Sequence, residues 1–462
     1  MTTPEQDTQT GSDSIFGRPY RTLTLGIIAI ITVAAFEGMA VITAMPVVVA
    51  DLNGLVWYAW TFTAFVAPSL YAMVVAGEMA DLHGPPRPLL LGLGGFALGT
   101  LIAGLAVNMP VLLLGRGVQG LGFGAVIVAI YVVIGKAYPE DMRPRMFTAL
   151  SGAWVVPGIV GPVVAGTIAD TIGWRWVFLG VLLLMLPIAA VLVPRLLALH
   201  LPGDPAALPR EGRKRRALMA AVGVAMLQLA GQLLSLVGLL LVLPALALLA
   251  FSVPQLLPPG ALRLRRGLPM VVMMRGFLAG AFFSTEAFVP LMLVNERGLA
   301  TATAGVALTG GTMGWFVGSW YQGRPTTKVP RWLLVQAGSA LVTLGIVLTM
   351  LALIPAVPPL IVLVTWAIGA LGMGVIFGSL GVLLLQLSAP QEQGVNSASL
   401  QIADSLGVVL CAGLGGVIFA AGHTSAGNDA AVFALIFAVM AVIAGAATLV
   451  APRVRPIGAS VV

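Results

Sequence analysis

The chain has 462 residues, of which 59% are hydrophobic and only 9% are charged, and its mean hydropathy is +1.03. This composition lies far outside that of soluble domains. Apolar stretches of about 20 residues exclude the alternating pattern of a membrane β-barrel. One cysteine excludes an intramolecular disulfide framework, and three scattered histidines argue against a metal centre. The sequence predicts an all-α, polytopic membrane protein without a cofactor.

The chain carries 24 basic and 17 acidic residues, which gives a formal charge of +7. The basic residues are spread over short segments between apolar stretches. This distribution sets the orientation of membrane spans and does not indicate nucleic-acid binding. Residues 1–21 are polar and lack the basic and apolar parts of a cleavable signal. We therefore expect this tail in the cytoplasm, with the first span directing insertion.

Apolar windows and the breaks between them predict two groups of six membrane-spanning helices. The first group forms an N-terminal bundle over residues 22–194, with spans at 22–50, 56–80, 88–107, 110–135, 146–169 and 174–193. The second forms a C-terminal bundle over residues 268–451, with spans at 268–294, 302–322, 331–353, 357–387, 394–421 and 430–451. Residues 452–462 are predicted to form a second cytoplasmic tail.

The segment between the two groups is basic on both flanks. Residues 195–216 hold several prolines and a run of basic residues, and are predicted to be a cytoplasmic linker. Residues 217–258 carry no charge, and a second basic cluster begins at Arg263. Because both flanks should lie in the cytoplasm, residues 217–258 either cross the membrane twice, joined near Gly231, or lie in its plane as a hairpin. The double crossing gives fourteen spans.

Charged side chains deep inside the predicted spans are costly and normally serve function. Arg116 lies in the fourth span and Glu37 in the first. At about 1.5 Å per residue, Glu37 lies roughly 24 Å along its helix from the inner edge and Arg116 about 9 Å from the outer edge of a core about 30 Å thick. The two are therefore predicted to meet at similar depth. Gly115, Gly117 and Gly120 are expected to let the first span come close.

Three motifs are built from glycine, proline and charge. The loop after the second span reads Gly77-Glu-Met-Ala-Asp81-Leu-His-Gly84-Pro-Pro-Arg87, and its acid can accept hydrogen bonds from the N-terminus of a neighbouring helix. The fourth span contains Arg116-Gly-Val-Gln119-Gly-Leu-Gly122. The fifth contains Pro157-Gly-Ile-Val-Gly161-Pro162-Val-Val-Ala-Gly166, a pattern that kinks a helix and opens a groove for a partner.

These motifs resemble those of the major facilitator superfamily, in particular its drug:proton antiporters with fourteen spans, and the similarity covers nearly the whole chain. It extends to Phe36-Glu37 in the first span and to Trp174-Arg-Trp before the sixth. The resemblance implies two six-helix bundles with two extra central helices, and rocking of the bundles about a central site. It also implies conformational motif residues, namely Gly77, Asp81, Gly84, Arg87, Gly161, Pro162 and Gly166.

Four positions depart from that pattern. Pro86 stands where a basic residue is usual, and Ala165 replaces one glycine. Gln322 stands where the C-terminal repeat of the loop has an acid, which weakens the expected latch in that half. Asp404 lies in the thirteenth predicted span, where many relatives carry arginine or glutamine.

The acids and their neighbours predict the chemistry of the interior. Glu37 is expected to bind the proton, with Arg116 tuning it and Gln119 as a hydrogen-bonding partner. The alternative is a purely structural Glu37–Arg116 ion pair. Asp404 is assigned to proton coupling, with helix packing as its alternative.

Aromatic side chains accompany two of these acids. Glu286, with Phe282, is expected to hold a cationic amphiphile, while packing or lipid contact is the alternative for the phenylalanines. Phe36 adjoins Glu37 and is assigned to substrate binding together with Gln119.

The sequence therefore predicts a proton-coupled exporter of hydrophobic or amphiphilic small molecules, such as drugs, in a bacterial membrane. It is expected to be a monomer with both termini in the cytoplasm, no nucleic-acid partner, no metal and no enzymatic activity. One alternative is an exporter of lipids or cell-envelope precursors. A more remote one is a non-transporting membrane subunit or a membrane enzyme, for which the sequence shows no catalytic set.

Overall fold

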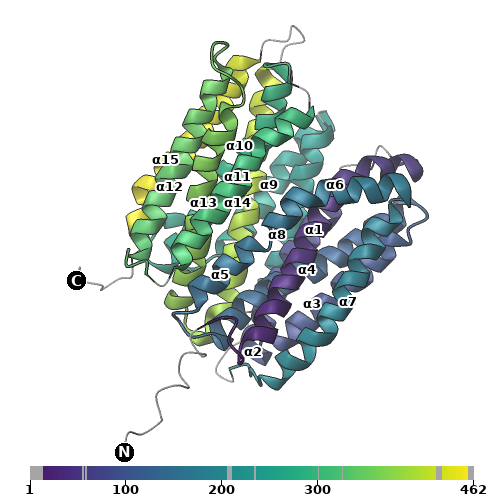
Figure 1. Cartoon of the computed structure of the whole chain (residues 1–462), viewed down its shortest axis with the longest axis vertical. Coiled ribbons are helices and arrows are strands. Elements are labelled where there is room, and N and C mark those ends of the chain that lie inside the picture. The colour runs from purple at the N-terminus through teal and green to yellow at the C-terminus, as the bar shows by residue number, and fades with distance from the viewer. Residues whose placement is uncertain are drawn as a thin grey trace, which may run out of the picture.

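The computed structural model describes residues 14–54, 57, 60–204, 211–233, 236–299, 301–324, 326–422 and 429–455. Every long element in these residues is a helix, as expected for apolar segments that must satisfy their backbone hydrogen bonds internally in lipid. The helices form two bundles that lie side by side (Figure 1).

The N-terminal bundle contains seven helices among the described residues: α1 (Arg21–Asp51), α2 (Trp60–His83), α3 (Pro86–Gly104), α4 (Met109–Ala137), α5 (Arg143–Gly152), α6 (Val155–Thr171) and α7 (Arg175–Ala198). A helical pair follows, α8 (Arg213–Leu233) and α9 (Leu236–Leu256), and then a short 3-10 helix, η2 (Ala261–Arg263). The C-terminal bundle contains α10 (Leu268–Asn295), α11 (Thr301–Gly323), α12 (Arg331–Thr349), α13 (Ile361–Leu387), α14 (Gln393–Gly422) and α15 (Ala430–Val450).

The two bundles repeat one packing scheme. In the first, α1 packs against α6 and α7, while α4 packs against α2 and α3. In the second, α10 packs against α14 and α15, while α13 packs against α11 and α12. The fifth predicted span of the N-terminal bundle is interrupted between α5 and α6. It also bends by 43° within α6, between the segments Arg143–Gly158 and Val163–Thr171. Pro157 and Gly158 end the first of these segments, as the helix-breaking pattern predicts.

Glycines on α4 determine how closely its neighbours approach. A Cβ atom at Gly120 would lie 2.1 Å from the carbonyl oxygen of Phe65 on α2, and one at Gly115 would lie 2.5 Å from the backbone nitrogen of Ala103 on α3. At Gly117 the nearest atom also belongs to α2. The expectation that these glycines admit the first span is therefore wrong, because the spacing of small residues indicates close approach but not the partner.

Eleven helices in the described residues are long and apolar enough to cross a membrane, or twelve if α5 and α6 form one bent span. They include α9 but neither α8, which begins with four basic residues, nor α11. The chain is thus a multi-pass membrane protein with about twelve spans. Two additional central spans are not shown by this count.

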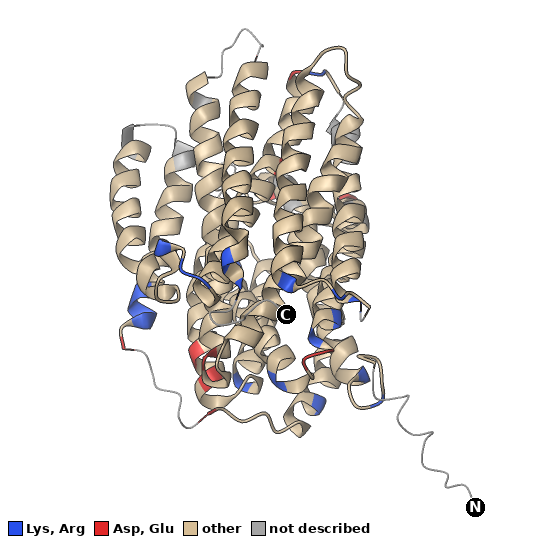
Figure 2. Cartoon of the chain, turned by 90° about the vertical axis from the view of Figure 1, so that its left-hand side faces the viewer, with Lys and Arg blue, Asp and Glu red and all other residues tan. Residues whose placement is uncertain are grey.

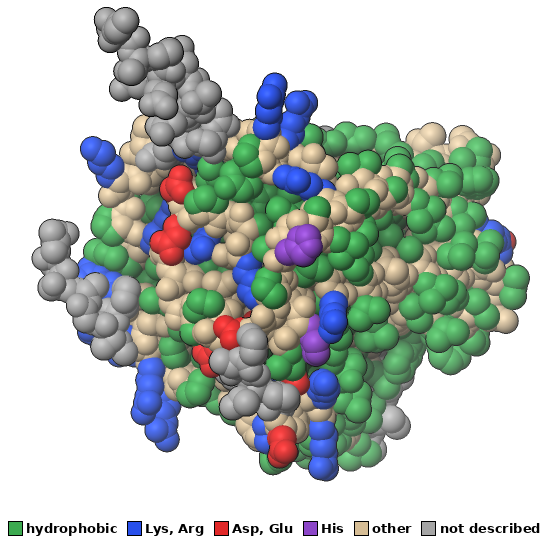
Figure 3. Space-filling view, turned by 90° about the horizontal axis from the view of Figure 1, so that it is seen from below, with side chains coloured by type: hydrophobic (Ala, Val, Ile, Leu, Met, Phe, Trp, Pro, Cys, Tyr) green, Lys and Arg blue, Asp and Glu red, His purple; other side chains and the backbone are tan. Residues whose placement is uncertain are grey.

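Lysine and arginine gather at one end of the bundles, the end at which α1 begins (Figure 2). Seen from this end, basic and acidic side chains lie across the face, while hydrophobic side chains cover most of one flank (Figure 3). We call it the basic end. The loops between α2 and α3 and between α13 and α14 lie here, and the pair α8–α9 starts and finishes here.

Candidate transport site

An ion pair between Arg116 of α4 and Glu37 of α1 is buried inside the N-terminal bundle. Their Nη1 and Oε1 atoms lie 2.5 Å apart, and the two residues are 4% and 1% exposed. The same Nη1 donates to Oε1 of Gln119 at 2.6 Å. One guanidinium nitrogen is thus shared by a carboxylate and a neutral amide. A change in the charge of Glu37 would therefore alter how Arg116 is held.

Groups from α2 and α3 complete the surroundings of Arg116. Its Nε donates to the carbonyl of Thr61 at 3.3 Å, and its guanidinium lies 4.4 Å from the ring centre of Phe65. Gln119 donates to the hydroxyl of Thr100 on α3 at 2.8 Å. The first four helices therefore meet at one polar network inside the bundle. Sequence reasoning identified the two charged members and Gln119 but not Thr61 or Thr100.

A second buried pair lies in the C-terminal bundle. Nε of Arg275 on α10 donates to Oδ1 of Asp404 on α14 at 2.6 Å. The arginine side chain is 3% exposed and stacks over the ring of Phe377, while Asp404 is 23% exposed. Nη1 of Arg275 is buried without a hydrogen-bond partner among the described residues. In the N-terminal bundle the first helix, α1, provides the acid of the pair, whereas in the C-terminal bundle the first helix, α10, provides the arginine.

Aromatic rings connect this second pair to Glu286. The indole nitrogen of Trp366 on α13 donates to Oε1 of Glu286 on α10 at 3.3 Å. Phe282, one turn earlier on α10, stacks on Trp366 with ring centres 4.4 Å apart. Trp315 contacts both Phe282 and Phe377, and the guanidinium of Arg275 lies over the ring of Phe377. Phe282 is buried in this cluster and does not face lipid.

The bundles are hydrogen-bonded to each other at the basic end through Asp81. Its two carboxylate oxygens accept from the backbone N–H groups of Gly394 and Val395, at 2.7 and 2.8 Å, in the first turn of α14. A carboxylate is favoured there because a helix N-terminus carries unpaired N–H groups and positive potential. Gly77 permits the contact, since a Cβ atom would lie 2.5 Å from the Gly394 carbonyl oxygen. Gly84 has φ +84°, which turns the chain after α2.

A second seam at the basic end joins α5 to α11 through neutral groups. Nε2 of Gln322 donates to the carbonyl of Pro144 at 3.3 Å and to the hydroxyl of Thr148 at 3.1 Å. Thr148 donates to the carbonyl of Ser319 at 2.6 Å. An acid at position 322 could not donate to Pro144 in its charged form. Glutamine therefore does not leave this seam without contacts, although the charged latch expected of the family is absent.

Comparison with known proteins agrees with this two-bundle architecture. A sequence profile described as "Major Facilitator Superfamily" matches residues 27–357, which is more than half of the chain. The chain belongs to this superfamily. It is therefore a secondary transporter and not an enzyme.

The chain is also similar to individual relatives and to solved structures of transporters. The Multidrug transporter protein MdtP of Bacillus subtilis is 28% identical over 407 residues, covering 84% of this chain and 73% of that relative. The human organic anion transporter MFSD10 superposes with a TM-score of 0.69 at 11% identity, over 93% of this chain and 99% of that structure. A bacterial homologue of the iron transporter ferroportin, in an outward-facing state, gives 0.68 at 10% identity, over 94% and 98%. The chain is thus distantly related to multidrug efflux transporters, and the structures show the shared fold.

The remaining residues singled out from the sequence occupy varied positions in this transporter. Phe36 is half-buried on α1 and lies near Gly161 of α6, at which a Cβ atom would be 3.8 Å from the phenylalanine ring and 3.2 Å from Met39. Gly166 faces Thr43 of α1 at 3.9 Å by the same measure. These glycines lie along the contact between α1 and α6.

The last two predicted motif residues, Arg87 and Pro162, lie in α3 and α6. Arg87 is exposed and makes no hydrogen bond or ion pair with another described residue. The backbone of Pro162 lies in α6, and its side chain is outside the described residues. No cluster of metal-binding side chains occurs in the described part of the chain.

Proposed function

We propose that this protein is a proton-coupled antiporter that exports hydrophobic or amphiphilic small molecules, such as drugs. The observation that carries the proposal is the network in which Arg116 is shared between Glu37 and Gln119 inside the N-terminal bundle. A buried carboxylate held by one guanidinium can exist charged and paired, or protonated and released. The distant kinship with multidrug transporters supports this type of cargo.

In the proposed cycle, protonation of Glu37 removes the ion pair while Arg116 keeps its hydrogen bond to Gln119. The guanidinium then remains charged without a counter-ion, which favours a different arrangement of α1 against α4. Deprotonation on the other side of the membrane restores the pair. Asp404 is proposed as a second coupling carboxylate, because it is paired with Arg275 and is more exposed than Glu37.

The cargo is proposed to contact the aromatic cluster of the C-terminal bundle. Glu286 supplies a negative charge, and Phe282 and Trp366 supply ring faces beside it, a combination that suits an organic cation with an apolar body. Phe36 and Gln119 are proposed to complete the site from the other bundle. Cation binding that is unchanged after Glu286→Ala would remove this acid from the site.

The proposed topology has fourteen spans, with α8 and α9 crossing between the two bundles and with both termini in the cytoplasm of a bacterial cell. Basic residues on each side of the α8–α9 pair support this orientation. The hydrogen-bonded seams at the basic end then close the cytoplasmic side, which corresponds to an outward-facing state. A reporter fused after residue 233 would be active outside the cell if α8 crosses the membrane.

Reconstitution into proteoliposomes tests the proton role. The purified protein should drive efflux of a fluorescent cationic amphiphile when a pH gradient is imposed. Glu37→Gln should abolish this gradient-driven flux and retain exchange of labelled for unlabelled substrate, because the exchange needs no net proton movement. Glu140→Gln, a matched loss of an exposed carboxylate at the basic end, should change neither.

Other results would contradict the proposal. Full gradient-driven efflux by Glu37→Gln would make the Glu37–Arg116 pair structural. Movement of a fluorescent phospholipid, without movement of the cation, would favour the lipid-exporter alternative. Absence of proton-coupled flux for every amphiphile would favour a non-transporting subunit.

A further inference from the structure

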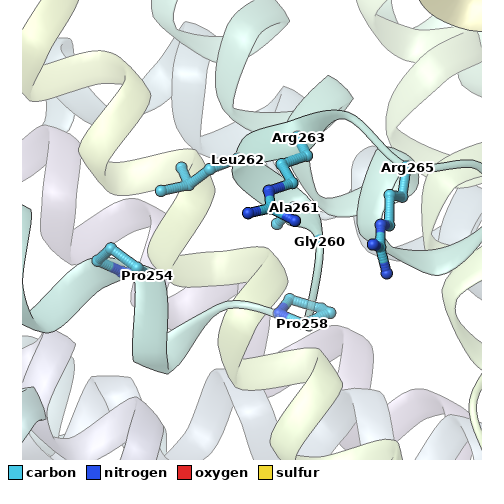
Figure 4. Close-up of a pocket in the computed structure, with 7 residues that line it drawn as sticks. All are labelled: Pro254, Pro258, Gly260, Ala261, Leu262, Arg263 and Arg265. Atoms are coloured by element: carbon cyan, nitrogen blue, oxygen red, sulfur yellow. The ribbon is translucent and has the colours of Figure 1, made fainter.

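A pocket of about 210 Å³ lies at the foot of α9, at the basic end. The last turn of α9 and the chain that leads from it into η2 form this pocket (Figure 4). Its lining combines apolar groups with two arginines: Pro254, Pro258, Gly260, Ala261, Leu262, Arg263 and Arg265. It is separate from the proposed transport site, which lies inside the two bundles.

The arginines of this pocket are available to an anion. Arg263, Arg265 and the adjacent Arg266 are exposed, and none makes a hydrogen bond or ion pair with another described residue. The turn that presents them is held in unusual backbone conformations, with φ +89° at Gly260 and +49° at Leu264. A leucine in the left-handed region is strained, because its Cβ atom crowds the backbone. The surrounding structure therefore maintains this turn between the two arginines.

The position of the pocket points to an amphiphilic anion. Above it runs α9, a helix apolar enough to cross a membrane, whose exposed side chains include Leu239, Leu243, Leu246 and Phe251. Acyl chains can pack along this face while a headgroup reaches the pocket at the helix end. Guanidinium groups bind phosphate through paired hydrogen bonds, and basic pockets beside membrane helices hold anionic headgroups.

The foot of α9 is also attached to the seam between the bundles. Nη2 of Arg213, at the start of α8, donates to the carbonyls of Leu256 on α9 and Val395 on α14, at 3.1 and 3.3 Å. The hydroxyl of Ser399 donates to the same Leu256 carbonyl at 2.7 Å. The Val395 N–H is one of the two groups bound by Asp81. The first turn of α14 is therefore held by α2 through its N–H groups and by the α8–α9 pair through a carbonyl.

We propose that the pocket binds the phosphate headgroup of an anionic phospholipid, between Arg263 and Arg265, and thereby stabilises the closed basic end. A bound headgroup fixes the turn that follows Leu256. That residue connects α9 to Arg213 and α14. The lipid acts as a regulator of the conformational equilibrium and is not the transported substrate.

Binding can be measured without any transport assay. The full-length protein, stripped of lipid in detergent, is titrated with short-chain phosphatidylglycerol and followed by native mass spectrometry. The double variant Arg263→Gln/Arg265→Gln should bind this lipid at least tenfold more weakly. The control Arg18→Gln/Arg21→Gln removes the same charge from exposed positions at the same end and should bind normally. Equal affinity of the pocket variant and the unaltered protein would overturn the proposal.

Two further measurements identify the source of the phosphate and its effect. Inorganic phosphate at equal concentration should not displace the lipid, and displacement would show a site for free phosphate. In nanodiscs, adding phosphatidylglycerol to phosphatidylcholine should slow amide hydrogen exchange at Gly394 and Val395 at least threefold in the unaltered protein. The pocket variant should show no slowing. Slowing of equal size in both proteins would mean that the lipid acts elsewhere.

Discussion

Replacing Arg116 by methionine while Glu37 is kept tests whether the two side chains form one coupled unit. The substitution removes the donor to three acceptors: the Glu37 carboxylate, the Gln119 amide oxygen and the Thr61 carbonyl. Methionine is similar in length and apolar, so it fills much of the space of the arginine stem. The main loss is therefore electrostatic.

The magnitude follows from burial. Glu37 is 1% exposed, so its carboxylate cannot regain water when the arginine is lost. Breaking a buried ion pair in this way typically costs about 3 to 5 kcal/mol, since one charge is left uncompensated. Glu37→Gln should cost a similar amount, because it leaves the guanidinium buried and unpaired. The double variant Glu37→Gln/Arg116→Met has no isolated charge and should be less destabilised than either single variant.

The assay is reversible unfolding in lipid bicelles, with the four proteins of the cycle compared under one set of conditions. The expected coupling energy is about 3 kcal/mol or more, a difference of over a hundredfold in the unfolding equilibrium constant. If the double variant lost as much stability as the two single variants added together, the residues would be energetically independent. The depth argument and the proposed proton switch would then both fail.

Three further outcomes are expected. Asp81→Asn removes the charge bound to the first turn of α14. Because hydrogen bonds to charged groups contribute about 1.5 to 3 kcal/mol, amide exchange at Gly394 should accelerate roughly tenfold or more, and unchanged exchange would contradict the role of Asp81 in holding α2 to α14. Trp366→Phe keeps an aromatic ring but loses the N–H donated to Glu286, so titration with a cationic amphiphile should show binding weakened about tenfold. If the cation bound this variant as tightly as the unaltered protein, Glu286 would not belong to the site. Gly84→Ala places a Cβ at φ +84°, 2.1 Å from a backbone carbonyl oxygen, and should lower the yield and melting temperature of the folded protein; a melting temperature equal to that of the unaltered protein would refute this strain.

Hydropathy predicts where helices begin and end because lipid imposes both length and apolar character. The span predicted at 268–294 is observed as Leu268–Asn295, and that at 430–451 as Ala430–Val450. Span counting is less certain where helices are rich in glycine, threonine or terminal charge. For this reason α11, with its glycine and threonine residues, falls outside the set that length and composition alone assign to the membrane among the described residues.

Depth along a helix also predicted one contact between helices. Glu37 and Arg116 were matched by their distances from opposite membrane edges, and their side chains form an ion pair. The pairing of Arg275 with Asp404 was not predicted from the sequence. Matching by depth gives height but not direction around the helix axis, so several partners remain possible without the packing.

Arg213 shows a different reason for a missed contact. It belongs to a run of basic residues that has the composition of a solvated linker, yet it is 3% exposed and bonded to α9 and α14. The sequence contains no signal that separates it from the neighbouring basic residues. Only the docking of α8 against α2 and α14 selects this one side chain for burial.

The two seams at the basic end differ in strength, and this difference bears on how the bundles separate. The α2–α14 seam has a carboxylate on two N–H groups at a helix N-terminus, and Arg213 reinforces the same turn. The α5–α11 seam depends on the neutral donors Gln322 and Thr148. Charge-assisted hydrogen bonds are roughly twice as strong as neutral ones. Separation should therefore begin between α5 and α11, where the break between α5 and α6 already interrupts the helix, while the α8–α9 pair keeps the opposite seam closed longest.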